Sequence, residues 1–191
     1  IKPDVSLACF VQYIIIVVMI NFPSLKKNVS LKVRGSMESP QCFGFAGLGF
    51  MNRLFHVGID VGSTTVKIAV LDRNYNLVCK AYKRHYSDIR KTIWQLINDT
   101  CDSFKNADIT AMVTGSGGIA VSEWLGLPFI QEVIAGTKAI ERFIPQTDVA
   151  VELGGEDAKI TYLRGNMEQR MNGTCAGGTG AFIDQMASLL K

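Results

Sequence analysis

The feature of this sequence that most restricts its fold is a short pattern that occurs twice, with Gly62 in the first copy and Gly154, 92 residues later, in the second. In each copy an apolar run ends in a carboxylate, a glycine follows two residues later, and a lysine follows seven residues after the carboxylate, within a strand-like stretch. The matched residues are Asp60, Gly62 and Lys67 in the first copy and Glu152, Gly154 and Lys159 in the second. This period is too long for a solenoid repeat, so it predicts two similar lobes that face each other.

The first copy also excludes two common nucleotide-binding motifs. Residues 54–60 are a short apolar run, residues 62–65 read Gly-Ser-Thr-Thr, and residues 66–71 alternate as a strand. A Walker loop or a dinucleotide-binding fingerprint runs from its glycines into a helix, whose N-terminus receives the phosphate. Here the glycine turn leads into a second strand, so each copy is predicted to be a strand–turn–strand unit.

The sequence between and after the two copies predicts alternating helices and strands, and therefore an α/β fold. Ser87 is placed to cap a helix whose apolar residues recur at spacings of three and four. The other expected elements are a strand over 109–114, a glycine turn at 115–118, a short helix through Trp124, a helix over 133–143 that Pro145 closes, and a helix after the glycine turn at 177–180.

Composition excludes several classes of protein. With 191 residues, 48% hydrophobic and 19% charged, the chain has enough apolar material for one globular core. Its net charge of +3 is spread thinly, without the lysine and arginine clusters that bind nucleic acid, so no nucleic-acid partner is expected. The five cysteines form neither a dense disulfide scaffold nor a CxxC pair, a pattern typical of proteins in the reducing cytoplasm.

Residues 1–50 differ in character from the remainder of the chain. Leu7–Ile20 is a nearly unbroken apolar run of 14 residues, which is shorter than the roughly 20 that a membrane-spanning helix needs. No small-residue cleavage site follows it, and the chain begins with Ile1. We expect the natural start to be Met51, with 1–50 a non-native leader or short apolar segment and 51–191 the N-terminal part of a folded domain. A true membrane anchor is the alternative.

The two turns have the composition of a phosphate clamp. Glycines let main-chain N–H groups approach a phosphate closely, and hydroxyl groups add donors. The residues expected to contact a nucleotide are Gly62, Ser63, Thr64, Thr65, Lys67, Gly154, Gly155, Lys159, Gly178, Thr179 and Gly180. One glycine-rich turn alone is more often a plain hairpin, but the matched pair and the two further glycine turns favour phosphate binding.

Four carboxylates lie at or beside these turns. Asp60 and Glu152 end the strands that enter the two turns, where they are placed to share a hydrated Mg²⁺, which takes one or two carboxylates together with water and phosphate oxygens. Glu156 and Asp157 lie in the second turn and are placed to orient an attacking water. These four residues are the predicted catalytic set.

Four stretches of the chain resemble the motifs of the BadF/BadG/BcrA/BcrD ATPase family: GIDVGSTTVK, VTGSGG, ELGGEDAKI and NGTCAGGTGAFIDQMASLL. The resemblance covers about residues 54–191 and is closest to the N-terminal ATPase region of the long, multi-domain activators of 2-hydroxyacyl-CoA dehydratases. It implies the fold of actin, Hsp70 and sugar kinases, truncated within the second lobe, with ATP and Mg²⁺ between two ribonuclease H-like lobes. It also implies a homodimer that uses ATP hydrolysis to drive an electron into a dehydratase-type partner protein or fused domain.

The same resemblance implies a 4Fe-4S cluster on the dimer axis, to which each chain gives two thiolates. Cys175 matches one of these cysteines, but Ala135 stands at the position of the other. We therefore expect that a symmetric homodimer of this domain does not hold a conventional four-cysteine cluster. The second turn also departs from the family pattern, with Glu152 and Glu156 where Asp and Gln are common.

Two other functions remain open at this stage. One is a small-molecule kinase of amino-sugar type, since one fold supports many functions, and the other is a non-catalytic module that closes on a nucleotide. Several further residues are not expected to take part in catalysis. Trp94 and Trp124 are expected to be packing anchors, His56 lies within a strand, His85 has no partner at metal-ligand spacing, and Cys79 and Cys101 are expected to be core thiols.

Overall fold

A computed structural model of the protein describes residues 27–29, 54–101, 104, 107–165, 167–172 and 179–190. Our expectations for the apolar run, for Cys175 and for Gly178 concern residues outside this part of the chain. Within 1–50 the described residues are β1 (Lys27–Val29), which pairs antiparallel with β5 (Asp108–Thr114). The sequence around β1 shows no strand periodicity, so this strand was not predicted. In the described residues, no helix is both long and apolar enough to cross a membrane.

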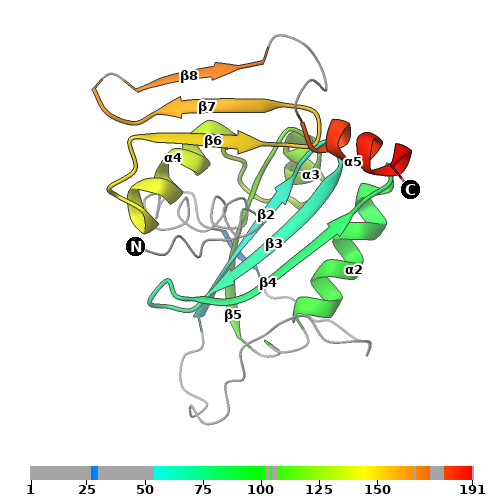
Figure 1. Ribbon diagram of the computed structural model, residues 1–191. Helices are drawn as coiled ribbons and strands as arrows, with labels where there is room; N and C mark the ends of the chain where they lie inside the picture. The colour runs from blue at the N-terminus through cyan, green and yellow to red at the C-terminus, as the bar shows by residue number, and fades with distance from the viewer. Residues whose placement is uncertain are drawn as a thin grey trace.

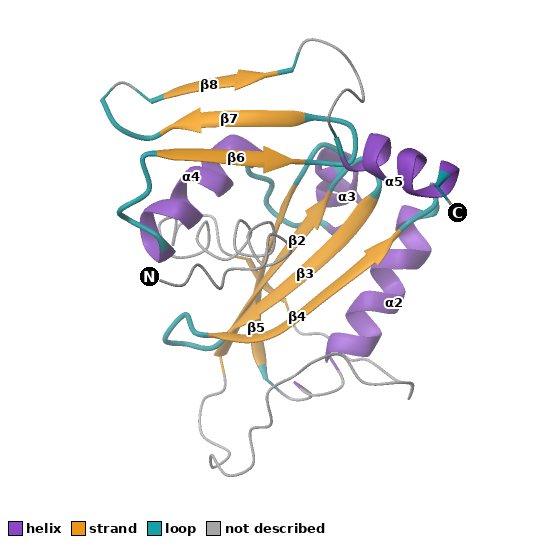
Figure 2. Ribbon diagram, in the orientation of Figure 1, coloured by secondary structure: helices purple, strands orange, loops and turns teal. Residues whose placement is uncertain are grey.

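The first lobe is built on a five-stranded sheet in the order β1-β5-β2-β3-β4 (Figures 1 and 2). Its longer strands are β2 (Leu54–Val61), β3 (Thr65–Leu71), β4 (Leu77–Arg84) and β5 (Asp108–Thr114). The pairs β2–β3 and β3–β4 are antiparallel hairpins, whereas β5 returns through α2 to lie parallel to β2. The predicted strands over 54–60, 66–71 and 109–114 are confirmed.

Helices cover both faces of this sheet. They are α2 (Ile89–Cys101), α3 (Gly118–Leu125) and α4 (Glu132–Phe143). Ile93 of α2 and Val121 of α3 pack with Val61 and Val113 in one core, while Ala135 of α4 packs on the opposite face. Because side chains alternate across a strand, the strand positions that face α4 include Asp60, Lys67 and Leu71.

The start of α2 differs from the prediction in one respect. Asp88, not Ser87, caps the helix, since its carboxylate accepts a hydrogen bond from the Lys91 N–H at 3.1 Å. Ser87 instead has a φ of 68°, in the left-handed region. The expected helices through Trp124 and over 133–143 are confirmed within one residue at each end.

The second lobe repeats the first hairpin. A three-stranded antiparallel sheet in the order β6-β7-β8 is formed by β6 (Val149–Leu153), β7 (Ala158–Tyr162) and β8 (Glu168–Met171), and α5 (Gly180–Leu189) follows. The Gly62 N–H donates to the Thr65 carbonyl at 2.9 Å, and 92 residues later the Gly154 N–H donates to the Asp157 carbonyl at 2.7 Å. The duplicated strand–turn–strand unit read from the sequence is therefore confirmed at the level of individual hydrogen bonds.

Three of the residues expected to be structural behave differently from the prediction. Trp94 and Trp124 are 64% and 45% exposed, so they do not anchor the core. The guanidinium of Arg90 lies 5.2 Å from the centre of the Trp124 ring, a cation–π distance that explains how this surface indole is held. His85 is buried and hydrogen-bonded, whereas His56 within β2 and Cys79 in the core match the prediction.

Candidate functional site

The two glycine turns lie face to face between the lobes. The hydroxyls of Ser63 and Thr64 in the first turn fill the space that a side chain at Gly155 would need, because a Cβ there would lie 3.1 Å and 2.5 Å from them. Gly180, the first residue of α5, donates its N–H to the Gly154 carbonyl at 2.9 Å. The sequence predicted that the two turns face each other, and the structure brings both turns and the start of α5 into contact.

A third glycine segment supports the first turn from behind. Gly115 has a φ of 97°, and a Cβ at this residue would collide with the Asp60 carboxylate and the Val61 carbonyl. The Gly117 N–H donates to the same Val61 carbonyl at 2.8 Å. Only glycine allows this close approach, and the result is that water is excluded from one side of Asp60.

Asp60 is a buried carboxylate with one oxygen paired and one unpaired. It is 2% exposed, and its Oδ2 accepts a hydrogen bond from Lys67 Nζ at 2.9 Å. Its Oδ1 has no hydrogen-bond partner among the described residues. Burial raises the pKa of Asp60 above its usual range, and the ion pair with Lys67 opposes this shift only in part. An unsatisfied buried carboxylate oxygen costs about 1–3 kcal/mol or more, so it is where a cation or donor is expected to bind.

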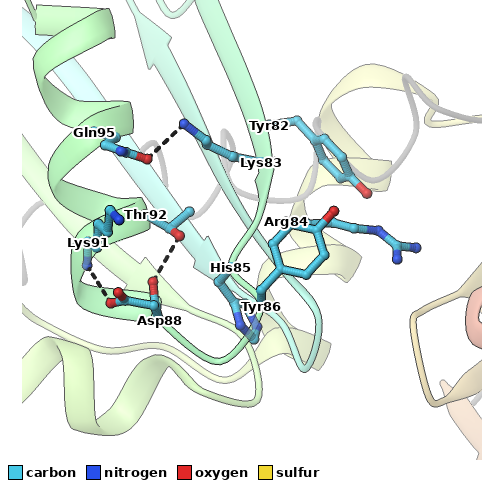
Figure 3. Close-up of a pocket in the computed structure, with 9 residues that line it drawn as sticks. All are labelled: Tyr82, Lys83, Arg84, His85, Tyr86, Asp88, Lys91, Thr92 and Gln95. Carbon is cyan, nitrogen blue, oxygen red and sulfur yellow. Dashed lines mark hydrogen bonds between the residues drawn. The ribbon is translucent and has the colours of Figure 1, made fainter.

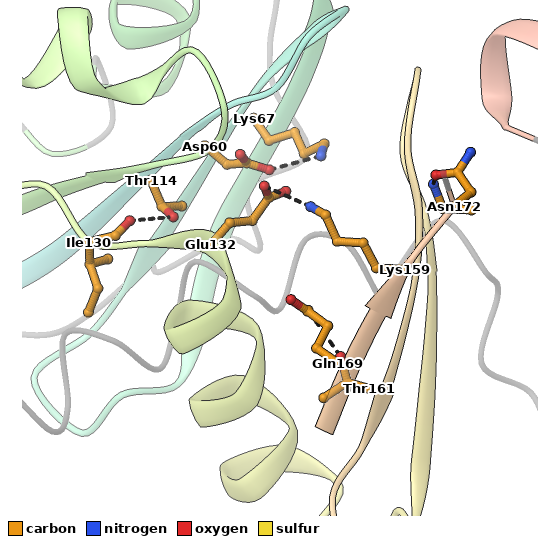
Figure 4. Close-up of polar contacts among 10 residues, drawn as sticks. Asp60, Lys67, Thr114, Ile130, Glu132, Lys159, Thr161, Gln169 and Asn172 are labelled. Carbon is orange, nitrogen blue, oxygen red and sulfur yellow. Dashed lines mark hydrogen bonds and ion pairs between the residues drawn. The ribbon is translucent and has the colours of Figure 1, made fainter. Parts of the chain in front are cut away.

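A second ion pair lies beside the first. Lys159 Nζ of β7 is 2.8 Å from Glu132 Oε2 at the start of α4, and both side chains are largely shielded from solvent. Figure 4 shows Glu132 reaching from α4 toward Asp60 on one side and Lys159 on the other. Burial alone would lower the pKa of Lys159, but its bond to Glu132 and the nearby charges of Glu152 and Asp157 raise it overall. Lys67 and Lys159 therefore both point into this group of charged side chains.

Glu152 completes this group of charges. It lies opposite Lys159 in the β6–β7 register, as Asp60 lies opposite Lys67 in β2–β3. Burial raises the pKa of Glu152 to about 7; Lys159 opposes the shift, and the negative charges of Glu132 and Asp60 add to it. The site therefore holds three carboxylates and two lysines in a poorly hydrated space, with Glu152 half ionised near neutral pH.

The remaining predicted residues vary in their exposure. Glu156 is exposed at the tip of the second turn, Asp157 is half-buried, and Thr65 and Thr179 are buried. Within the described residues, no group of three or more His, Cys, Asp or Glu side chains is arranged to hold a metal by itself. Glu132, which the structure places at the start of α4 and pairs with Lys159, was missed by the sequence analysis. Its signal, an acid in the first turn of an amphipathic helix, is too common to mark a site.

The chain has two lobes, each built on a hairpin, and their glycine turns are in contact next to paired carboxylates. This arrangement is the fold of actin, Hsp70 and sugar kinases. Residues 57–191 match the model of the BadF/BadG/BcrA/BcrD ATPase family, and the chain belongs to this family. It is 28% identical over 145 residues to the 2-hydroxyisocaproyl-CoA dehydratase activator of Clostridioides difficile, covering 72% of this chain and 53% of that protein.

Two further relatives show the same extent of similarity. The (R)-2-hydroxyglutaryl-CoA dehydratase activating ATPase of Acidaminococcus fermentans is 28% identical over 144 residues, which cover 72% of this chain and 54% of the relative. The structure of the 2-hydroxyisocaproyl-CoA dehydratase activator from Clostridium difficile with bound ADPNP superposes with a TM-score of 0.56 at 26% identity, covering 71% of this chain and 52% of that one. The chain thus spans about half the length of the relatives it matches.

Proposed function

We propose that this chain is part of an ATP-binding and ATP-hydrolysing activator that drives electron transfer to a 2-hydroxyacyl-CoA dehydratase-type partner. The observation that carries the proposal is the contact of two matched glycine turns next to the buried carboxylate of Asp60 and the half-buried carboxylate of Glu152. Relatives named as dehydratase activators, one of them with bound ADPNP, support the same reading.

The turns would bind the phosphates of ATP. Backbone N–H groups and the Ser63 and Thr64 hydroxyls in the first turn, together with Gly154 and Gly155 in the second, are donors of the kind that hold phosphate oxygens. Lys67 and Lys159 supply positive charge beneath the turns, although each is already paired with a carboxylate. The Thr179–Gly180 start of α5 adds a helix N-terminus next to Gly154.

The carboxylates fit a Mg²⁺ ion that accompanies the nucleotide. Mg²⁺ takes one or two carboxylates and fills its other positions with water and phosphate oxygens, so the absence of a three-ligand group among the described residues agrees with this role. Asp60 Oδ1 is unpaired and Glu152 lies in the equivalent strand position, so these two residues would hold the ion. Bound there, Mg²⁺ would neutralise phosphate charge and act as a Lewis acid.

The chain's own residues would prepare the hydrolysis step. Lys67 holds the carboxylate of Asp60 in one orientation through Oδ2 and so leaves Oδ1 directed away from the pair. In the second lobe, Lys159 is held by an ion pair with Glu132 of α4. Glu156 and Asp157, in the second turn, would orient the attacking water.

The partner and assembly form the second part of the proposal. We infer a cytoplasmic homodimer that passes an electron to a dehydratase-type partner protein or fused domain. The names of the relatives, which are activators of CoA dehydratases, support the dehydratase-type partner. The cysteine expected to ligate iron, Cys175, lies outside the described residues, and Ala135, which is buried on α4, stands where the family resemblance implies the other ligand. We maintain that a symmetric pair of these chains lacks the four thiolates of a conventional 4Fe-4S cluster.

ATP hydrolysis by the full-length protein tests the proposed function. Asp60→Asn removes the charge that would hold Mg²⁺ but keeps the shape of the side chain, so Mg²⁺-dependent turnover should fall by about 100-fold or more, as the loss of a metal-holding charge commonly does. Asp108→Asn, at an exposed carboxylate at the start of β5, is the matched control and should retain full turnover. Equal rates in the wild type and Asp60→Asn would contradict the assignment.

A further inference from the structure

The first glycine turn is held from behind by one histidine. His85 lies at the end of β4, is 7% exposed, and directs its Nε2 at the Gly62 carbonyl oxygen, 3.2 Å away. Its own backbone N–H donates to the Thr64 carbonyl, also at 3.2 Å. A single residue from a neighbouring strand therefore contacts two carbonyls of the turn.

The hydrogen bonds around the ring fix its protonation. The Ser87 N–H donates to His85 Nδ1 at 3.0 Å, so Nδ1 is an acceptor and the ring proton lies on Nε2, where it can be donated to the Gly62 carbonyl. Tyr86 and Ser87 have φ angles of 45° and 68°, and the Asp88 N–H closes the turn on the His85 carbonyl at 2.7 Å. Consecutive non-glycine residues in the left-handed region cost free energy, and such backbone strain clusters at functional sites.

Holding these carbonyls fixes the direction of two N–H groups. In a planar trans peptide the carbonyl and the N–H of the next residue point in opposite directions. With the Gly62 and Thr64 carbonyls directed at His85, the N–H groups of Ser63 and Thr65 point to the opposite side of the turn. Donors that are already ordered before a ligand arrives bind it more tightly, because no conformational entropy is lost in ordering them.

We propose that His85 is a positioning residue for nucleotide binding: it holds the peptide groups of the first turn in the orientation that presents their N–H donors to a phosphate. This inference rests on the proposed function. His85 also lines a pocket of about 610 Å³ between the end of β4 and the start of α2 (Figure 3).

Two substitutions separate the two hydrogen bonds of the ring. His85→Gln places an amide near the position of Nε2 and can still donate to the Gly62 carbonyl. His85→Asn has an amide near the position of Nδ1, so it can satisfy the Ser87 N–H but does not reach Gly62. We expect the ATP dissociation constant to rise about tenfold in His85→Asn and to stay within about threefold of wild type in His85→Gln.

The kinetic signature separates positioning from general loss of structure. Because the donors hold ground state and transition state alike, His85→Asn should raise KM for ATP about tenfold with kcat within about threefold. His56→Asn is the matched control, since His56 is also buried and bonds Thr110 Oγ1 at 2.6 Å within the same sheet. It should lower the thermal midpoint and leave ATP affinity unchanged.

Hydrogen exchange without nucleotide tests the role of His85 independently of the proposed function. The amides of residues 62–65 should exchange faster in His85→Asn than in wild type and His85→Gln, because the turn loses its support. If His85→Asn does not fold, His85→Met, which also lacks the donor, takes its place. Unchanged exchange and affinity in the donor-free variant, or equal loss in His56→Asn, would overturn the proposal. If the wild type binds no ATP but residues 62–65 still exchange faster in His85→Asn than in the wild type, the proposed function alone would be overturned.

Discussion

The raised pKa of Glu152 makes the stability of the protein depend on pH in a direction that can be measured. The pKa is about 7 in the folded state against 4.5 for an ordinary glutamate, mainly because the side chain is buried, with Lys159 opposing the shift. The folded state therefore holds the proton more tightly than the unfolded state. The stability that comes from the neutral carboxyl is fully present below pH 4.5 and is lost as the pH rises to 7 and above.

The magnitude follows from the size of the shift. Since each pKa unit corresponds to about 1.4 kcal/mol, the loss for Glu152 amounts to about 3 kcal/mol. Glu152→Gln keeps the shape and removes the ionisation, so it should match wild type near pH 4.5 and exceed it by about 3 kcal/mol at pH 8. Burying an uncharged amide in place of a partly charged acid is the physical reason.

Urea denaturation at a series of pH values, without Mg²⁺ or nucleotide, provides the measurement. Glu123→Gln, at an exposed glutamate of α3, is the control and should follow the wild type at every pH. A difference between wild type and Glu152→Gln that stays constant from pH 4.5 to pH 8 would refute the argument, because it would mean that Glu152 ionises equally easily in the folded and unfolded states.

Two other predictions address the turns and the cysteine. Gly155→Ala places a methyl group 2.5 Å from Thr64 Oγ1, so it should push the turns apart and cost about 1–3 kcal/mol of stability in urea denaturation. Thr64→Ala in the same protein should recover part of that stability, and no recovery would argue against the contact. Anaerobic reconstitution with iron and sulfide should not yield four irons per dimer; about four irons that are lost in Cys175→Ala would show that the missing cysteine at Ala135 does not prevent cluster assembly.

Much of the fold could be predicted because it depends on local patterns that repeat. The glycine that follows the carboxylate, and the alternation after it, are enough to specify a hairpin, and two copies specify two lobes. The cap of α2 was assigned one residue early because Ser87 and Asp88 both suit an N-cap. In the structure Ser87 has a left-handed backbone and donates its N–H to His85, and the Asp88 carboxylate caps the helix.

The charged cluster was only partly predictable for a different reason. Asp60 and Glu152 were found because each ends a strand of the repeat, and their lysines were found at the same offset. Glu132 belongs to neither copy and meets Lys159 only because α4 packs across the sheet. His85 looked isolated since its partners are backbone groups of residues 62 and 87, which leave no trace in the side-chain sequence.

The contact between Gly155 and Thr64 has a mechanical consequence for a protein that works through a nucleotide. With the two turns already touching, a phosphate chain can lie between them only if the lobes move apart. Under the proposed function the nucleotide would act as a wedge, and its length would set the angle between the lobes. Loss of the terminal phosphate would let the turns approach again. Cleavage of one bond would then change the angle between the lobes, and with it the surface that is presented to a partner protein.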